Sequence, residues 1–285
     1  MNLKGGIELS KKNPLRIAVF SDMHFMAWKD TNLPVEWVPQ LAHSLVDAKS
    51  LSPDIVVMNG DLTNGKDRDY ALAMQHVRAN ISVPTYFTMG NHEYYGFYED
   101  DEYSFEMAQQ RFMRHTNQQS IYYSAEMPQA TLLFLSPECY KPDEFGDAAW
   151  ISDAQLAWFE GALLEARNDR PVLIFLHQPI NDTVADSTGY CVSSDEVRRI
   201  LAKRPGCFMI SGHTHCRMDR SDQFVVQDGT VFVGGGCCCN DIPQSRWFDV
   251  YEDRIDIRIR NHDTRSWDGD DFAHTVRLNS GAAVV

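Results

Sequence analysis

Five short polar clusters along the chain combine the carboxylate, imidazole and amide side chains that bind metal ions. In chain order they are Asp22 with His24, Asp61, Asn91 with His92, His177, and His213 with His215. Each cluster alone has an ordinary explanation, because Gly-Asp and Gly-Asn are common turn sequences and a lone histidine after a strand is more often structural. Five clusters in order are far harder to explain by chance, so we predict a metal centre.

Apolar runs rich in β-branched residues must position these clusters, and each run is typical of a buried strand. The runs cover residues 15–20, 55–58, 83–87, 131–135, 172–176 and 208–210. All but the fourth lead into a polar cluster. Ligands in α/β sheets gather outside the carboxyl ends of strands, so the clusters can converge in space. An extended backbone would also put Asp22 and His24, or His213 and His215, on one face.

Helical patterns separate the apolar runs and make this an α/β chain. Apolar residues recur at helical spacing over residues 38–46 and 70–77. Residues 255–260 alternate isoleucine with charged residues, as a half-buried strand does, and we expect this portion to complete a second sheet. Two later helices begin with a capping box, in which two side chains satisfy free backbone amides. The pairs are Ser152 with Gln155 and Ser193 with Glu196.

Composition limits the class of protein. A chain of 285 residues, 44% of them hydrophobic, can form a single domain over residues 1–285 with a sizeable core. The formal net charge of −14 argues against nucleic acid as a partner. Apolar runs fall far short of the ~20 residues needed to cross a bilayer, and the N-terminus lacks the pattern of a cleavable signal. We therefore expect a cytoplasmic protein without membrane contact.

Seven cysteines include three in a row at Cys237, Cys238 and Cys239. They form no pair of C-x-x-C motifs, so we expect reduced thiols that are mostly small buried residues. Cys216 directly follows the last histidine cluster and the triple run follows three glycines, so either could lie close to a metal site.

The ordered motifs D-x-H, G-D, G-N-H-E, H-x-P and G-H-x-H resemble the signature of the calcineurin-like metallophosphoesterase superfamily. They span residues 22–215, about two-thirds of the chain. The resemblance implies a metal-dependent hydrolase of phosphoesters. It also implies an α/β fold of four layers, an α-β-β-α sandwich in which two mixed sheets are flanked by helices and the metals lie at the strand ends.

The same resemblance assigns roles to the clusters. It implies two divalent or trivalent transition-metal ions, and the mixed ligands favour Mn, Fe or Zn over Ca. Two such ions can hold a bridging hydroxide for in-line attack on phosphorus. His92 resembles a residue outside the ligand set and is the natural general acid. The first ion would be bound by Asp22, His24 and His215, the second by Asn91, His177 and His213, and both by Asp61.

Further segments resemble the bacterial class III cyclic-nucleotide phosphodiesterase branch, including residues 60–64 and 155–159. The chain departs from that branch at Glu93, where aspartate is usual, and at Gln178, where a second histidine is common. Neither residue is a proposed ligand. The resemblance favours a small phosphodiester as the substrate, with 3',5'-cyclic nucleotides as candidates.

Other functions stay open from the sequence. The same two-metal core can serve a phosphomonoesterase or a nucleotide pyrophosphatase when only the loops change. A non-catalytic protein-interaction module is less well supported, because all seven ligand candidates and His92 are present. A homo-oligomer is also open, since the loops at residues 94–103 and 138–150 could wall a substrate pocket or pack against a partner subunit.

Overall fold

Strands from the first third of the chain and from its C-terminal part form one mixed sheet. The computed structural model describes residues 13–27, 37–238 and 243–284. Eight strands within these residues form the sheet: β1 (Leu15–Phe20), β2 (Ile55–Asn59), β3 (Thr85–Thr88), β10 (Gln244–Val250), β11 (Arg254–Asn261), β12 (Ser266–Trp267), β13 (His274–Asn279) and β14 (Ala282–Ala283). Their order is β14-β13-β11-β10-β1-β2-β3, with β12 paired to β11. β1, β2 and β3 run parallel, whereas β10 lies antiparallel to β1.

Strands from the middle of the chain form the second sheet. In the described part of the chain it has six strands: β4 (Tyr123–Glu126), β5 (Thr131–Phe134), β6 (Val172–Phe175), β7 (Phe208–Ser211), β8 (Phe224–Gln227) and β9 (Thr230–Gly234). Their order is β4-β5-β6-β7-β9-β8. The inner neighbours are parallel and both edge strands are antiparallel, so this sheet is mixed as well.

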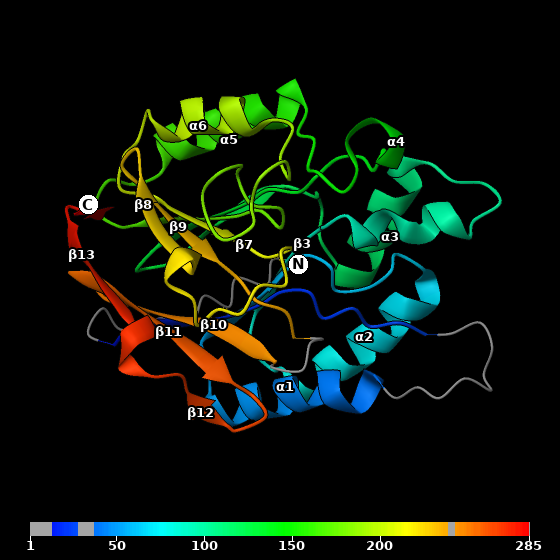
Figure 1. The fold of residues 1–285 in the computed structure, drawn as a ribbon, viewed down its shortest axis with the longest axis horizontal. Coiled ribbons are helices and arrows are strands. Elements are labelled where there is room, and N and C mark those ends of the chain that lie inside the picture. The colour runs from blue at the N-terminus through cyan, green and yellow to red at the C-terminus, as the bar shows by residue number, and fades with distance from the viewer. Residues whose placement is uncertain (1–12, 28–36, 239–242, 285) are drawn as a thin grey trace, which may run out of the picture.

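Helices cover the outer faces of both sheets (Figure 1). The main ones are α1 (Trp37–Leu51), α2 (Asp67–Asn80), α3 (Phe105–Thr116), α4 (Pro142–Phe145), α5 (Asp153–Glu165) and α6 (Ser194–Leu201). Shorter 3-10 helices are η1 (His92–Tyr98), η2 (Ser221–Gln223) and η3 (Asp270–Phe272). α1 and α2 lie against the first sheet, and α5 and α6 against the second. None of the helices among the described residues is long and apolar enough to span a membrane.

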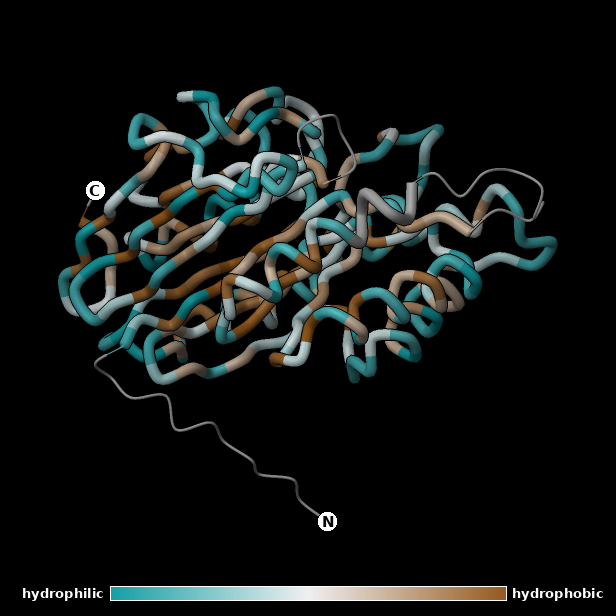
Figure 2. Tube along the Cα trace, turned by 90° about the horizontal axis from the view of Figure 1, so that it is seen from below, coloured by the Kyte–Doolittle hydropathy of each residue, from teal (hydrophilic) through white to brown (hydrophobic). Residues whose placement is uncertain are grey.

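Alternate residues of the buried strands face different layers. In β1, Ala18 and Phe20 belong to the core beneath α1 and α2, whereas Ile17 and Val19 belong to the core between the sheets. A third core lies between the second sheet and α5 and α6, where Phe159 is fully buried. Figure 2 shows the apolar strands in the interior and more polar segments outside. The predicted four-layer α-β-β-α sandwich is confirmed.

Two local predictions are wrong. Ser152 caps α5 by accepting a hydrogen bond from Gln155 N–H, but the reciprocal half of the box is absent because Ser152 N–H donates to Glu138 Oε2, and Ser193 makes no side-chain cap at α6. The Ser193 hydroxyl is instead engaged with the backbone N–H and C=O of Ile151, at 3.0 and 3.2 Å. The C-terminal β-structure is present, but it belongs to the sheet that contains β1 rather than to a second sheet, because β10 pairs directly with β1.

Candidate metal centre

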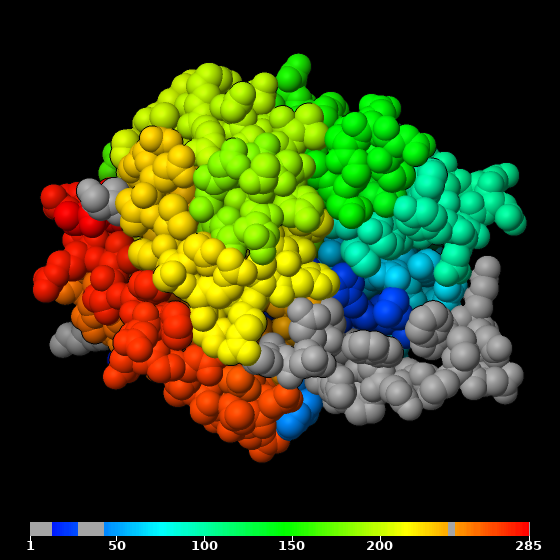
Figure 3. All heavy atoms as spheres, viewed as in Figure 1, coloured from blue at the N-terminus to red at the C-terminus, as the bar shows by residue number. Residues whose placement is uncertain are grey.

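The predicted metal ligands gather where the carboxyl ends of strands from both sheets meet. They follow β1, β2 and β3 in the first sheet and β6 and β7 in the second. In the space-filling view, the segment after β7, in yellow, lies against the segment after β1, in dark blue (Figure 3). The convergence expected from the strand ends therefore holds.

Two adjoining groups of predicted ligand atoms form in this region. In the first group, His215 Nε2 lies 3.0 Å from Asp22 Oδ1 and 3.2 Å from His24 Nε2. In the second group, atoms that lie within 4.8 Å of one another come from Asp61, His177 and His213. His177 Nε2 is 3.0 Å from Asp61 Oδ2 and 3.8 Å from Asp22 Oδ1. The grouping agrees with the two ligand sets that the resemblance implies, whose assignment to ions stays a prediction.

The backbone at most of these residues is left-handed rather than extended. Asp22, His24, Asp61, His213 and His215 all have φ between 48° and 69°. This conformation costs roughly 1–2 kcal/mol for a residue with a side chain, although Asp and His adopt it more readily than most. The prediction of an extended backbone is therefore wrong for both pairs. The side chains converge because the chain turns at each residue after its strand has ended.

Hydrogen bonds between the loops keep these turns in place. The backbone N–H of Asp22 donates to the C=O of Gly60 at 3.2 Å, and that of His24 to the C=O of Asp61 at 2.9 Å. The N–H of His213 donates to Asp22 Oδ2 at 3.1 Å, which joins the loops of the two sheets. Strained backbone of this kind persists only where its surroundings impose it, and it is concentrated at functional sites.

Two glycines make room for the ring of His177. A Cβ atom on Gly60 would lie 2.5 Å from His177 Cβ, and one on Gly90 would lie 2.6 Å from His177 Cδ2. Gly60 also has a φ of +80°. The turn explanation for these two glycines is therefore incomplete, because neither position can hold a side chain while His177 occupies its place.

Three predicted ligand atoms are buried in the site. Among the described residues, Asn91 Oδ1 has no hydrogen-bond partner, while Asp22 Oδ1 and His177 Nε2 lie 3.0 Å from atoms of other predicted ligands, His215 Nε2 and Asp61 Oδ2. Native proteins rarely leave buried polar atoms in this state. His177 Nδ1 lies 2.8 Å from the C=O of Asn59, which can only accept, so Nδ1 carries a proton and Nε2 is the ring nitrogen that faces the carboxylates and would bind a metal ion in place of a proton. These residues therefore fit the binding of metal ions.

The electrostatics of the site also favour cations. Burial lowers the pKa of His177, but Asp61 and Asp22 outweigh it and raise this pKa to about 10. Burial alone would raise the pKa of Asp22, yet His177 and His215 lower it to about 2. Burial lowers the pKa of His213 to about 4, which keeps its imidazole neutral, as ligation requires. The two buried carboxylates thus attract positive charge, which a metal ion can supply in place of a proton.

Glu93 organises the loops after β2 and β3. Its carboxylate accepts hydrogen bonds from the backbone N–H groups of Asp61, Thr63 and Gly90, at 2.9, 3.0 and 2.7 Å. Burial, followed by the nearby Asp61, raises the pKa of Glu93 to about 7. From the sequence, Glu93 was identified only as a departure from a related branch, and its hydrogen bonds to the two loops were not predicted. Its position directly after His92 in the Gly-Asn-His-Glu motif was the one sequence feature that could have indicated this role.

His92 faces the same region and is partly open to solvent, with 25% of its side chain exposed. Its Nε2 lies 3.9 Å from Asp61 Oδ2 and shares a group within 4.8 Å with atoms of His24 and Asp61. Its Nδ1 lies 2.8 Å from Asn64 Oδ1, which only accepts, so Nε2 is the nitrogen free to exchange a proton. Burial lowers the pKa of His92, and Asp61 partly offsets that effect.

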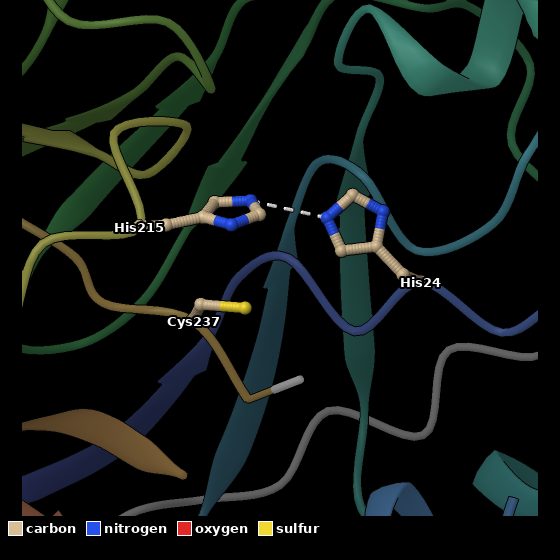
Figure 4. Close-up of side chains that lie close together, drawn as sticks. All are labelled: His24, His215 and Cys237. Carbon is tan, nitrogen blue, oxygen red and sulfur yellow. Dashed lines mark hydrogen bonds between the residues drawn. The ribbon is translucent and has the colours of Figure 1, made fainter. Parts of the chain in front are cut away.

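Cys237 lies beside the first group of ligand atoms. Its Sγ is within 4.8 Å of ring nitrogens of His24 and His215, and Figure 4 shows the three side chains close together on separate segments. Cys237, the first residue of the triple run, therefore does lie near the predicted metal site. Cys237 is disulfide-bonded, so the expectation of a reduced thiol is wrong there. Cys239 lies outside the described residues, and free thiols occur at Cys139, Cys191, Cys207, Cys216 and Cys238.

Comparison with known proteins identifies relatives by sequence. The family model described as calcineurin-like phosphoesterase matches residues 15–217. A probable cyclic nucleotide phosphodiesterase of Rhodopseudomonas palustris is 25% identical over 211 residues, which cover 70% of this chain and 72% of that protein. The glycerophosphodiester phosphodiesterase GpdQ of Enterobacter lignolyticus is 27% identical over 175 residues, which cover 57% of this chain and 56% of that protein.

Solved structures share the fold at low identity. A dimetal phosphatase from Danio rerio superimposes with a TM-score of 0.70 at 15% identity, covering 94% of this chain and 100% of that one. The purple acid phosphatase PPD1 from yellow lupin gives a TM-score of 0.64 at 12% identity, covering 92% of this chain and 53% of that one. At such identities the likeness is one of fold, and it agrees with the two-sheet sandwich.

Proposed function

The chain belongs to the calcineurin-like phosphoesterase family, and we propose that it hydrolyses a small organic phosphodiester by means of two bound transition-metal ions. Membership of the family makes the protein a phosphoester hydrolase. The metals, the residue roles and the diester substrate are our proposal. The proposed ligands are Asp22, His24, Asp61, Asn91, His177, His213 and His215.

The observation that carries the proposal is the buried cluster of ligand candidates, in which Asn91 Oδ1 has no hydrogen-bond partner among the described residues and Asp22 Oδ1 and His177 Nε2 face atoms of other proposed ligands. Carboxylate, amide and neutral imidazole together suit Mn, Fe or Zn better than Ca. When bound, two such ions would lower the pKa of a water molecule and neutralise charge on the phosphoryl oxygens.

We assign the proton transfer to His92. Asn64 holds Nδ1 of the ring, which leaves Nε2 able to deliver a proton to the leaving alkoxide as its bond to phosphorus breaks. An anionic phosphodiester beside the ring favours the protonated imidazole and so opposes the effect of burial on its pKa. The net reaction consumes one water and gives a phosphomonoester and an alcohol, which for a cyclic nucleotide are two groups of one ring-opened product.

The preference for diesters draws on the sequence relatives, which are named as a probable cyclic nucleotide phosphodiesterase and a glycerophosphodiester phosphodiesterase. A 3',5'-cyclic nucleotide is the first candidate within this class. The structural neighbours are named as phosphatases, so a monoester is the alternative substrate. A non-catalytic role is less well supported, because the full donor set and His92 are all in place.

A hydrolysis screen on Mn-loaded protein tests the proposal. The panel holds 3',5'-cyclic nucleotides, glycerophosphodiesters, nucleoside monophosphates and nucleotide pyrophosphates at equal concentration. We expect the highest kcat/KM for a diester, and activity that disappears in Asp61→Ala. A monoester or pyrophosphate turned over faster than every diester would overturn the substrate class. Hydrolysis that survives in Asp61→Ala would overturn the assigned site.

A further inference from the structure

Tyr95 and Asp147 form a hydrogen-bond chain that ends on Asn91. Asn91 Nδ2 donates to Tyr95 Oη at 3.2 Å, and Tyr95 Oη donates to Asp147 Oδ1 at 3.1 Å. Tyr95 lies in η1, four residues after Asn91, whereas Asp147 follows α4 in the connection between β5 and β6. These hydrogen bonds therefore link the loop that follows β3 in the first sheet to the connection between β5 and β6 in the second sheet.

Both hydrogen bonds donate in the same direction, from Asn91 to Tyr95 and from Tyr95 to Asp147. An ionised carboxylate can only accept, so the hydroxyl proton of Tyr95 is directed to Asp147. Tyr95 Oη then offers only lone pairs to Asn91, which must present its NH2 group there. The amide oxygen, Asn91 Oδ1, is consequently on the opposite side of the carboxamide, where it is buried and has no hydrogen-bond partner in the described part of the chain.

Neighbouring side chains keep Tyr95 and Asp147 in place. The Tyr95 ring packs on His92, with 4.0 Å between the centroids, and on Tyr140 at 5.1 Å. Tyr98 also contacts the Tyr95 ring, and its Oη is 2.6 Å from that of Tyr140. The backbone C=O of Asp147 accepts a hydrogen bond from the side chain of the buried Gln178 at 3.0 Å. Gln178 directly follows the proposed ligand His177.

We infer that Tyr95 and Asp147 are positioning residues, which orient the Asn91 carboxamide so that its oxygen rather than its NH2 group faces the second metal ion. The inference rests on the proposed function in one respect, the role of Asn91 as a ligand. An amide turned by half a rotation would direct two N–H bonds at a cation. Partners of this kind beyond the ligands typically change metal affinity by about 10- to 100-fold.

Calorimetric titration of metal-free protein with Mn²⁺ tests the inference, because it resolves two binding steps. We expect Tyr95→Phe to weaken one step by about 10- to 100-fold and to leave the other unchanged. Tyr98→Phe is the matched control, since it removes a hydroxyl from the same aromatic cluster without touching Asn91, and both steps should match the wild type. Circular dichroism verifies that each variant is folded.

Asp147→Asn tests the direction of the chain. The new NH2 group can donate to Tyr95 Oη and free the hydroxyl proton to point at Asn91, which then turns its oxygen away from the metal. We expect the same step to weaken as in Tyr95→Phe, although the side chain hardly changes in size. Wild-type affinity in this variant would overturn the inference. Asp147 is only half-buried, so this variant also serves if Tyr95→Phe fails to fold.

An Asn91→Ala arm separates failure of the inference from failure of the proposed function. Loss of one binding step in Asn91→Ala together with wild-type binding in Tyr95→Phe would overturn the positioning role alone. Two unchanged steps in Asn91→Ala, or fewer than two Mn²⁺ ions bound by the wild type, would overturn the ligand assignment and the inference with it.

Discussion

Asp61 engages both oxygens of its carboxylate. Oδ1 accepts a hydrogen bond from His92 N–H at 2.9 Å, and Oδ2 lies 3.0 Å from His177 Nε2. We expect Asp61→Asn to lose at least one metal ion and nearly all turnover, because it removes the buried charge proposed to serve both ions. Elemental analysis of protein purified without chelator measures the metal content. Asp169→Asn, which changes an exposed carboxylate paired with Arg167, is the control and should keep both ions.

His92 should matter in proportion to how poor the leaving group is. An aryl phosphodiester loses an acidic phenol without help, whereas a sugar hydroxyl needs a proton as the bond breaks. We therefore expect His92→Ala to bind both metal ions and to lose about 10²- to 10⁴-fold in kcat on an alkoxide-leaving diester, but far less on the aryl ester. Steady-state kinetics on metal-replete protein give the two ratios. Equal losses on both substrates would remove His92 from the role of proton donor.

The places of the candidate ligands could be predicted because each of the five clusters follows its own strand, but their supporting partners could not. The left-handed φ of Asp22 and His24 arises from hydrogen bonds to Gly60 and Asp61, which are distant in the sequence. Asp147 stands 52 residues from Tyr95, and no local pattern marks that contact. Sequence motifs thus identify side chains that could bind metal, whereas their orientation depends on contacts made only in the folded chain.

At the scale of elements, helix α1 is tied to β11 by a buried ion pair. Asp47 accepts hydrogen bonds from Arg260 Nε and Nη2 at 2.8 and 2.9 Å, and lies 2.8 Å from His262 Nδ1. His262 Nε2 is 2.8 Å from Ser245 Oγ, which gives the spacing of a Ser-His-Asp triad. Ser245 and His262 are both 0% exposed, so no substrate can reach them and the network is structural.

We expect Asp47→Asn to lower the free energy of unfolding by about 3–5 kcal/mol, because it leaves the buried Arg260 without its counter-charge. Urea unfolding followed by circular dichroism measures this loss. Asp169→Asn serves again as the control, since solvent screens an exposed pair and its loss should hardly change stability. A loss no larger than in that control would contradict the role of the pair.

The same pair predicts how stability depends on pH. Burial by itself raises the pKa of Asp47, but hydrogen bonds from Arg260 and His262 outweigh it and hold the pKa well below its usual 3.8. The stabilisation is therefore fully present above the unfolded-state pKa and is lost as the pH falls below it towards the folded-state value. We expect the stability difference between wild type and Asp47→Asn to shrink below about pH 4. A difference that is constant down to pH 2 would contradict this.

Most strands could be placed from the sequence because apolar β-branched runs, such as residues 172–175 of β6, are buried on both faces. The order of the strands in each sheet could not be predicted, since β10 pairs with β1 across more than 200 residues of the chain. The capping sequence at Ser193 failed for a related reason, because Ile151 takes up its hydroxyl. Local patterns set the type of element, and long-range pairing decides its neighbours.

At the scale of the whole molecule, the proposed metal centre joins loops of both sheets, so it should stabilise the fold. Ions that bind only the folded protein contribute about 4 kcal/mol when present at 1,000 times their Kd. We expect EDTA to lower the Tm by roughly 10 °C relative to Mn-loaded protein. Differential scanning fluorimetry measures both states, and Asp61→Asn should respond much less. Equal Tm values with and without metal would argue against a centre that spans the sheets.

The insertion of β10 beside β1 has a consequence for the order in which the protein is made. β1 is synthesised first and pairs with β2 on one side, but its other edge stays open until residues 244–250 emerge and Phe248 reaches its place opposite Ile17. A nascent chain that already holds every proposed ligand therefore still exposes an apolar strand edge, which invites pairing with other chains. We expect a chain ended at residue 238 to sediment as aggregate while the full-length chain stays in the supernatant. A monomeric fragment that binds two metal ions would show that β1 does not need β10 as its partner. If the fragment aggregates, the ribosome must finish the last strands before the edge of the first strand is protected.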